Sequence, residues 1–324
     1  MDREFFMKRN IIKKIDFLLS FAIIAILLPL FITIICQRMR LEEVVYGELQ
    51  TVKEEEDPIA NAEETAALDI GKDVEEYLPG IVAMEINIGA NREAILAQCV
   101  IARTNLCDAR TRGTEEPDAM DIGRMQMLWG ERFDDAYQEL LSCIADTKGE
   151  VLTWNGNYIY AAYHSLSAGR TRNMSELYGE AQMPYLVERA CQEDVTAEGY
   201  LAVTYLQTDD FLERCRELFP DATLEQAADV VVQARDATGY VEELLLGDIS
   251  CTGEEFRSAL GLNSACFTIT EQDDQVRFVT RGLGHGFGLS QHAAVCMAEN
   301  GMDYKEILAY FYPGTEIYVI SPTK

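Results

Sequence analysis

The side chains in this chain with the most evident capacity for chemistry are histidines, serines and a glutamine that lie beside glycine. Residues 282–294 read GLGHGFGLSQHAA and hold two of the three histidines in the sequence. The third, His164, lies in the small-residue segment 163–169, YHSLSAG. Glycine lets another group approach the backbone closely, and the polar side chains donate and accept hydrogen bonds. This combination predicts a tight polar groove.

Three other kinds of site fit the run 282–292 less well. Its glycine spacing resembles a phosphate-binding loop, but the Lys-Ser/Thr end of such a loop and a βαβ context are missing. His285 and His292 are seven residues apart, which does not match a helical zinc pair. No G-x-S-x-G segment surrounds Ser165 or Ser290, as a nucleophile elbow would require. The pattern favours a groove for a hydroxyl-rich ligand such as a sugar polymer.

Glu85 is the carboxylate singled out as a candidate acid. In residues 81–86, IVAMEI, it is the only charge within an apolar stretch. Burial disfavours the charged form of a carboxyl group and raises its pKa, so that the group can act as a general acid near neutral pH. Two structural roles compete with this one: Glu85 could cap the exposed edge of its helix, or it could pair with Arg103.

Helices and short strands must position these residues. Asn91 is an expected N-cap, Pro79 is expected in a first helical turn, and Asn155-Gly156 predicts a hairpin turn. The expected helices span residues 77–88, 92–106, 133–145, 223–234, 290–299 and 303–312. The expected strands span residues 151–154, 158–162, 240–246, 249–251, 265–270 and 276–280. The sequence has no repeats and no βαβ alternation, so the expected fold class is α+β, with mixed helices and antiparallel strands that form a cleft.

The N-terminal region predicts a membrane anchor. Residues 17–36 carry no charge, and about 20 apolar residues in a helix span a bilayer core. A cleaved signal peptide is disfavoured because the run is long and no small-x-small site follows it. Four Lys/Arg residues lie between Lys8 and Lys14, shortly before the span, and two follow it, which favours a cytoplasmic N-terminus. We therefore expect a cytoplasmic tail (1–16), a transmembrane helix (17–37), an acidic linker (38–70) and an extracytoplasmic domain (71–324).

Composition excludes some functions. A net charge of −28 makes nucleic acid an unfavourable partner, because the chain would repel phosphates. The nine cysteines are scattered without a C-x-x-C pair, so the sequence predicts no metal framework and assigns no disulfide.

Four stretches together resemble the stage II sporulation protein D family, also called the SpoIID/LytB domain. They are residues 77–85 with 97–104, residues 163–171 with 184–186, residues 256–262, and residues 284–291 through 312–315. The resemblance covers roughly residues 74–320, and the order and spacing of the stretches match together.

This resemblance implies a membrane-tethered lytic transglycosylase that cleaves peptidoglycan glycan strands already stripped of stem peptides. It implies that Glu85 is the catalytic acid and base. The candidate residues for gripping the glycan and stabilising charge are Arg103, His164, Ser165, His285, Ser290 and Gln291. No cofactor is expected, and the implied partner, besides the glycan and the membrane, is the stage II sporulation protein P amidase.

Three departures from the family pattern matter. The usual H-S-T-S-G-G reads HSLSAG at residues 164–169, and His292 replaces a tryptophan. Residues 121–127 contain neither cysteine nor histidine, so the zinc site of some relatives is not expected here. The altered loop keeps open a glycan-binding module without catalysis, such as an amidase activator. An acidic exported domain with a structural role is the third alternative.

Overall fold

The computed structural model describes residues 74–175 and 183–320. The expected tail, transmembrane helix and linker, residues 1–70, lie outside these ranges. Across the described ranges, no helix has both the length and the hydropathy needed to cross a membrane.

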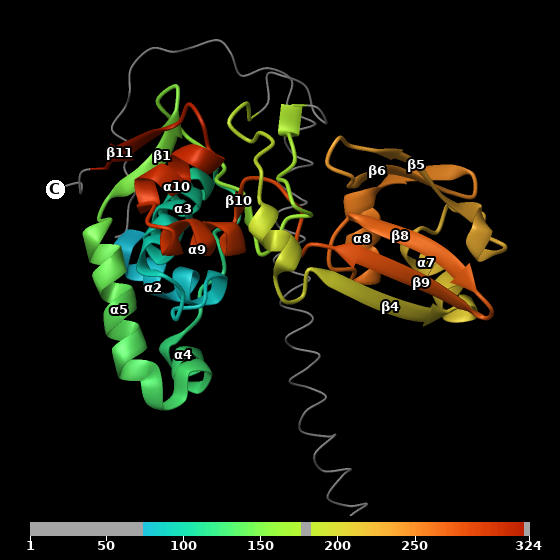
Figure 1. The fold of residues 1–324 in the computed structure, drawn as a ribbon, viewed down its shortest axis with the longest axis horizontal. Helices are drawn as coiled ribbons and strands as arrows, with labels where there is room; N and C mark the ends of the chain where they lie inside the picture. Colours follow the sequence, from blue (N-terminus) through green and yellow to red (C-terminus); the bar gives the residue numbers. More distant parts are fainter. Residues whose placement is uncertain (1–73, 176–182, 321–324) are drawn as a thin grey trace, which may run out of the picture. The chain divides into compact units, whose positions relative to one another are not determined.

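The described residues form a mixed α+β structure (Figure 1), as the sequence predicted. One hydrophobic core lies between three helices and a strand: α2 (Val74–Glu85), α3 (Arg92–Arg112), α5 (Phe133–Asp146) and β1 (Glu150–Trp154). The helix α2 begins three residues earlier than expected, so Pro79 lies inside the helix rather than in its first turn.

The helix α3 is the centre of this core. The Asn91 side chain accepts the Glu93 N–H at 3.0 Å and caps the helix, as predicted. Gly113, with φ of 71°, ends the helix in the left-handed conformation that glycine favours. The helices α9 (Gln291–Glu299) and α10 (Tyr304–Phe311) also pack on α3. The helix α4 (Ile122–Trp129) leads into α5 through a 3₁₀ turn.

The strands of the described ranges form small sheets. Three of these sheets are antiparallel: β11 (Glu316–Val319) with β1 and β2 (Asn157–Tyr158), β4 (Leu201–Gln207) with β9 (Gln275–Arg281) and β8 (Phe267–Gln272), and β5 (Val230–Arg235) with β6 (Val241–Leu246) and β7 (Ile249–Thr252). The fourth pairs β3 (Tyr163–His164) with β10 (Leu289–Ser290) in parallel, although the sequence predicted only antiparallel strands.

A second hydrophobic core lies in the strand-rich segment of residues 201–281. The helices α7 (Thr208–Leu218) and α8 (Gly253–Leu260) pack there with β4 to β9 around the rings of Phe256, Phe267 and Phe278. Figure 1 shows these helices and strands grouped together.

The expected helix over residues 223–234 is wrong, because most of this stretch belongs to other structure. The Thr223 hydroxyl donates to Asp248 at 2.6 Å and does not cap a helix. The β-branched run from Val230 to Val232 forms part of β5 and pairs with β6.

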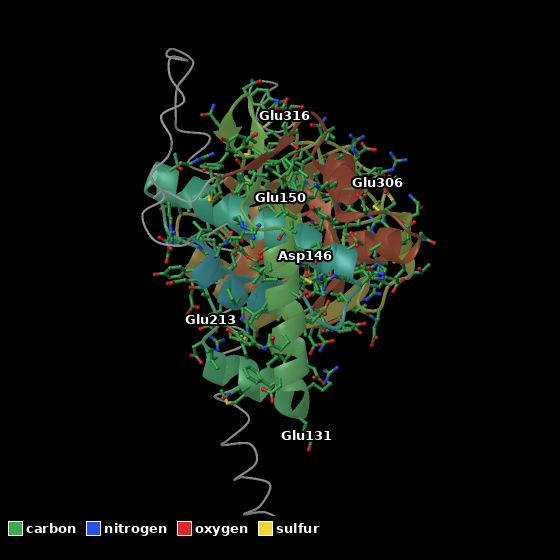
Figure 2. The ribbon with its side chains drawn as sticks, turned by 90° about the vertical axis from the view of Figure 1, so that its left-hand side faces the viewer. Glu131, Asp146, Glu150, Glu213, Glu306 and Glu316 are labelled. Atoms are coloured by element: carbon green, nitrogen blue, oxygen red, sulfur yellow. The ribbon has the colours of Figure 1, made fainter. Side chains whose placement is uncertain are left out.

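Many charges of this acidic chain lie at the surface. The exposed side chains of Glu131, Glu306 and Glu316 are labelled in Figure 2 and come from the 3₁₀ turn before α5, from α10 and from β11. Water hydrates such charges, so they impose little cost on folding.

Candidate functional site

Glu85 is the last residue of α2, and its carboxyl group contacts both α3 and β3. Gln98 of α3 donates from Nε2 to Glu85 Oε2 at 2.7 Å, and the Tyr163 hydroxyl of β3 donates to the same carboxyl group. Loss of hydration on burial is the largest effect and raises the pKa of Glu85 from 4.5 to about 7, while the two hydrogen bonds partly oppose the rise. Protonated and ionised Glu85 therefore coexist near neutral pH.

Gln291, the first residue of α9, reaches the same place from the other end of the chain. Its Nε2 donates to the Glu85 backbone carbonyl at 2.7 Å and to Gln98 Oε1 at 3.2 Å. Of the six residues expected to grip a glycan, Gln291 is the one that hydrogen-bonds Glu85 directly. The glycine-histidine run, residues 282–292, is thus connected to the candidate acid through Gln291.

The glycines of this run lie against the protein's own backbone. At Gly288, with φ of +67°, a Cβ atom would lie 1.9 Å from the Ala162 carbonyl oxygen. At Gly284, with φ of +113°, a Cβ atom would lie 2.7 Å from the Cβ of His164. The close approach that glycine permits here is between residues 282–288 and the segment around β3. The expectation that these glycines make room for a ligand is therefore corrected.

His164 and His285 are buried where these two segments meet, with exposed fractions of 4% and 5%. The His164 Nδ1 atom lies 3.0 Å from the Phe287 carbonyl oxygen, and the Phe287 N–H donates to His285 Nδ1 at 3.0 Å. Burial lowers the pKa of His164 to about 4 and the pKa of His285 well below its usual range. Both rings are neutral at pH 7, and they hold the backbone at Phe287.

Ser290 has no exposed surface and takes part in a hydrogen-bond network around Asp194. Its Oγ donates to Asp194 Oδ2 at 2.7 Å, and Ser167 donates to the same oxygen from its N–H and its Oγ. The His292 Nδ1 atom lies 3.2 Å from Asp194 Oδ1. Ser290 thus caps and anchors α9 and has no surface for a glycan, which differs from its expected role.

Ser165 lies in the loop that follows β3 and is half-buried. Its backbone carbonyl accepts the N–H of His292 at 3.2 Å. This bond ties the loop to the first turn of α9, next to Gln291. Ser165 keeps partial exposure close to the candidate site.

Arg103 is fully buried, and its guanidinium group is bound by the protein. Its Nε and Nη2 atoms donate to the two carboxylate oxygens of Glu75 at 2.8 and 3.0 Å, and Nη1 donates to the Glu150 carbonyl at 3.0 Å. The guanidinium group of Arg103 therefore has a structural role, whereas a contact with the glycan was expected. It also shows that the carboxylate bound to Arg103 is Glu75 and not Glu85.

Two polar neighbours of Glu85, Gln98 and Tyr163, were not expected as site residues. The sequence did contain an indication for Gln98, because Gln98 is a polar residue among the apolar residues of α3. In the structure its side chain is 1% exposed. Buried polar side chains need partners, so its position alone pointed to a polar neighbour. Tyr163 gave no comparable signal, since its contact with Glu85 joins distant parts of the sequence.

The His, Cys, Asp and Glu side chains of the described residues are not gathered into a metal site. Within residues 74–175 and 183–320, no group of three or more His, Cys, Asp or Glu side chains could hold a metal ion. The eight cysteines of these ranges, from Cys99 to Cys296, are free thiols.

Comparison with known proteins agrees with the resemblance read from the sequence. The model of the SpoIID family, described as stage II sporulation protein, matches residues 61–154, which include Glu85 and Gln98. Stage II sporulation protein D of Bacillus subtilis (strain 168) is 29% identical over 259 residues, which cover 75% of this chain and 74% of the relative. The protein of the same name from Bacillus amyloliquefaciens is 28% identical over 259 residues, with the same two shares.

A further relative carries a different name. The amidase enhancer of Bacillus subtilis (strain 168) is 25% identical over 290 residues, which cover 74% of this chain and 40% of the relative. The family model and the two sporulation proteins agree, and together they identify the SpoIID family as the one that this chain resembles.

Proposed function

We propose that this protein is a lytic transglycosylase that cleaves the MurNAc–GlcNAc bonds of denuded peptidoglycan strands and leaves 1,6-anhydro ends. The observation that carries the proposal is the environment of Glu85, whose raised pKa of about 7 lets one carboxyl group donate and accept a proton near neutral pH. Similarity to the SpoIID family supports it.

The mechanism uses one carboxyl group twice. Protonated Glu85 donates its proton to the oxygen that links MurNAc to GlcNAc, and the bond breaks as positive charge develops at C1 of MurNAc. The Glu85 carboxylate then takes the proton from the C6 hydroxyl of the same MurNAc, whose oxygen closes onto C1. Ordinary glycosidases use a second carboxylate and water. The causes of the raised pKa of Glu85 are burial, which raises it, and the hydrogen bonds from Tyr163 and Gln98, which oppose the rise; none of these is a second carboxylate.

The test is a digest of amidase-treated glycan strands with the full-length protein, read by mass spectrometry. The wild type should release fragments with 1,6-anhydro ends, and Glu85→Gln should release none. Glu131→Gln, which alters an exposed glutamate in the 3₁₀ turn before α5, is the matched control and should leave the digest unchanged. Undiminished release by Glu85→Gln would show that another group is the acid.

The second candidate function is a glycan-binding activator of a peptidoglycan amidase, without catalysis of its own. The relative named amidase enhancer is the observation that favours it. This function predicts that the protein sediments with denuded glycan while no anhydro ends form. The same digest therefore separates the two functions.

The proposed setting is the outer face of the cytoplasmic membrane during septal wall remodelling and engulfment in sporulation. It combines the names of the relatives with the transmembrane helix expected at residues 17–37. The proposed partners are the glycan strands and the stage II sporulation protein P amidase, which would supply strands without stem peptides. Cell fractionation and co-purification with that amidase test this setting.

A further inference from the structure

The two amide side chains next to Glu85 form an oriented chain of hydrogen bonds. Gln291 Nε2 donates to the backbone carbonyl of Glu85 at 2.7 Å and to Gln98 Oε1 at 3.2 Å, and Gln98 Nε2 donates to Glu85 Oε2 at 2.7 Å. The chain thus starts at the backbone of Glu85 and ends at the carboxyl group of the same residue.

One end of this chain can take only one orientation. A backbone carbonyl only accepts hydrogen bonds, so the Gln291 group that faces it must be the NH₂ group. The same NH₂ group faces Gln98 and therefore requires the amide oxygen of Gln98 on that side. The NH₂ group of Gln98 is then turned toward Glu85. A flipped Gln98 would place two NH₂ groups against each other.

Burial makes this orientation costly to lose. Gln98 is 1% exposed, so water cannot replace a partner that it loses. An NH₂ group donates and does not accept, so the Glu85 oxygen that it faces has to remain without a proton. The Tyr163 hydroxyl that hydrogen-bonds the same carboxyl group can accept as well as donate, so it does not exclude a proton. The acidic proton of Glu85 is therefore confined to the other oxygen, Oε1.

We propose that Gln291 and Gln98 are positioning residues that fix the proton of Glu85 on Oε1. Gln98 acts on the carboxyl group directly, and Gln291 acts only by orienting Gln98. The inference deepens the proposed function and rests on it, since the position of the proton matters for catalysis only if Glu85 is the acid. Its primary test, however, needs no activity.

The test measures the pKa of Glu85 by carbon-13 NMR in full-length protein labelled at the glutamate carboxyl carbon, with Glu85→Gln used to assign the signal. Gln98→Met keeps the size of the side chain and removes the donor, so the pKa of Glu85 should rise by about one unit, because a bond to the charged form is lost. Gln291→Met should raise it as well, by a smaller amount, although Gln291 does not contact the carboxyl group in the structure.

The double variant provides the decisive comparison. If Gln291 acts through Gln98, the pKa in Gln98→Met/Gln291→Met equals that in Gln98→Met alone, whereas independent effects would add. An unchanged pKa in Gln98→Met overturns the proposal, and an unchanged pKa in Gln291→Met overturns the role of Gln291. If Gln98→Met does not fold, Gln98→Asn takes its place, because it draws the amide away from Glu85 and should shift the pKa in the same direction.

Activity provides the second readout. The pH at which anhydro-product release falls to half should rise with the pKa of Glu85 in each variant. If the protein releases no anhydro product but the pKa shifts appear, the proposed function fails and the positioning of the proton stands. If product forms and the shifts do not appear, the positioning fails and the proposed function stands.

Discussion

Replacing Glu85 by Gln should stabilise the folded protein at alkaline pH and not at acidic pH. The pKa of Glu85 rises from 4.5 to about 7 because burial removes water from its carboxyl group. The folded state therefore holds a proton between these two pH values that the unfolded state has released. Stability falls as the pH rises through this window and stays at the lower level above it.

The size of the effect follows from the shift. Each pKa unit corresponds to 1.36 kcal/mol, so ionised Glu85 costs the folded state about 3 kcal/mol above pH 7. Gln resembles protonated Glu in shape, and its amide oxygen can accept the bond from Gln98 Nε2. Glu85→Gln should thus be more stable than the wild type by about 3 kcal/mol at pH 8, and nearly equal to it at pH 4.

Urea unfolding of both proteins, followed by circular dichroism at several pH values from 4 to 8, measures this difference. Glu131→Gln removes one exposed carboxylate and controls for the change in net charge. We expect its stability to differ little from the wild type at any of these pH values. A difference between Glu85→Gln and the wild type that is the same at pH 4 and pH 8 would refute the reasoning.

Three further predictions follow from the same structure. Product release should decline as the pH rises past about 7, because the first step needs protonated Glu85; a pH–rate profile checks this. Arg103→Met should lower the free energy of unfolding by about 3 to 5 kcal/mol, because it removes the buried guanidinium group that pairs with the Glu75 carboxylate. Denaturant unfolding measures this loss. Unchanged stability together with weaker glycan binding would contradict the structural role of Arg103. The Gly288→Ala variant should unfold at a much lower denaturant concentration than the Gly261→Ala variant. Both glycines have φ near +66°, and an alanine in this conformation costs about 1–2 kcal/mol at either position. Of the two, Gly288 is the position where the new Cβ atom would also clash with backbone, at the Ala162 carbonyl.

Much of the first core could be predicted because its signals are local. Asn91 is a cap that needs only the residues beside it, and the helix that it begins was expected at the right place. The hairpin at Asn155-Gly156 was predicted for the same reason, and β1 and β2 flank this turn. By contrast, Thr223 matched the pattern of a helix cap, but its hydroxyl donates a hydrogen bond to Asp248, which lies 25 residues further along the chain. A local pattern fails where a distant partner competes for the same group.

The candidate site was predicted in part for a similar reason. Glu85 could be proposed from its apolar surroundings and from the family resemblance, since both are visible in the sequence. The direction in which Arg103 and Ser290 point could not be read there, because the burial of each depends on tertiary packing. A residue type that can bind sugars can equally well bind a buried carboxylate, and here Glu75 and Asp194 are those carboxylates.

The strand-rich segment of residues 201–281 contributes to the site through the connection between β3 and β10. Parallel strands cannot be joined by a hairpin, so this connection had to be long, and here it contains the whole second core. Arg172 ties this core to the glycine-histidine run, because it binds Asp236 at 2.6 Å and Glu254 at 2.9 Å and its guanidinium carbon lies 4.5 Å from the centre of the Phe287 ring. Phe287 is the residue whose backbone the two buried histidines hold. The register of β10, and with it the position of Gln291 beside Glu85, therefore depends on packing in a segment that supplies no side chain to the hydrogen bonds around Glu85.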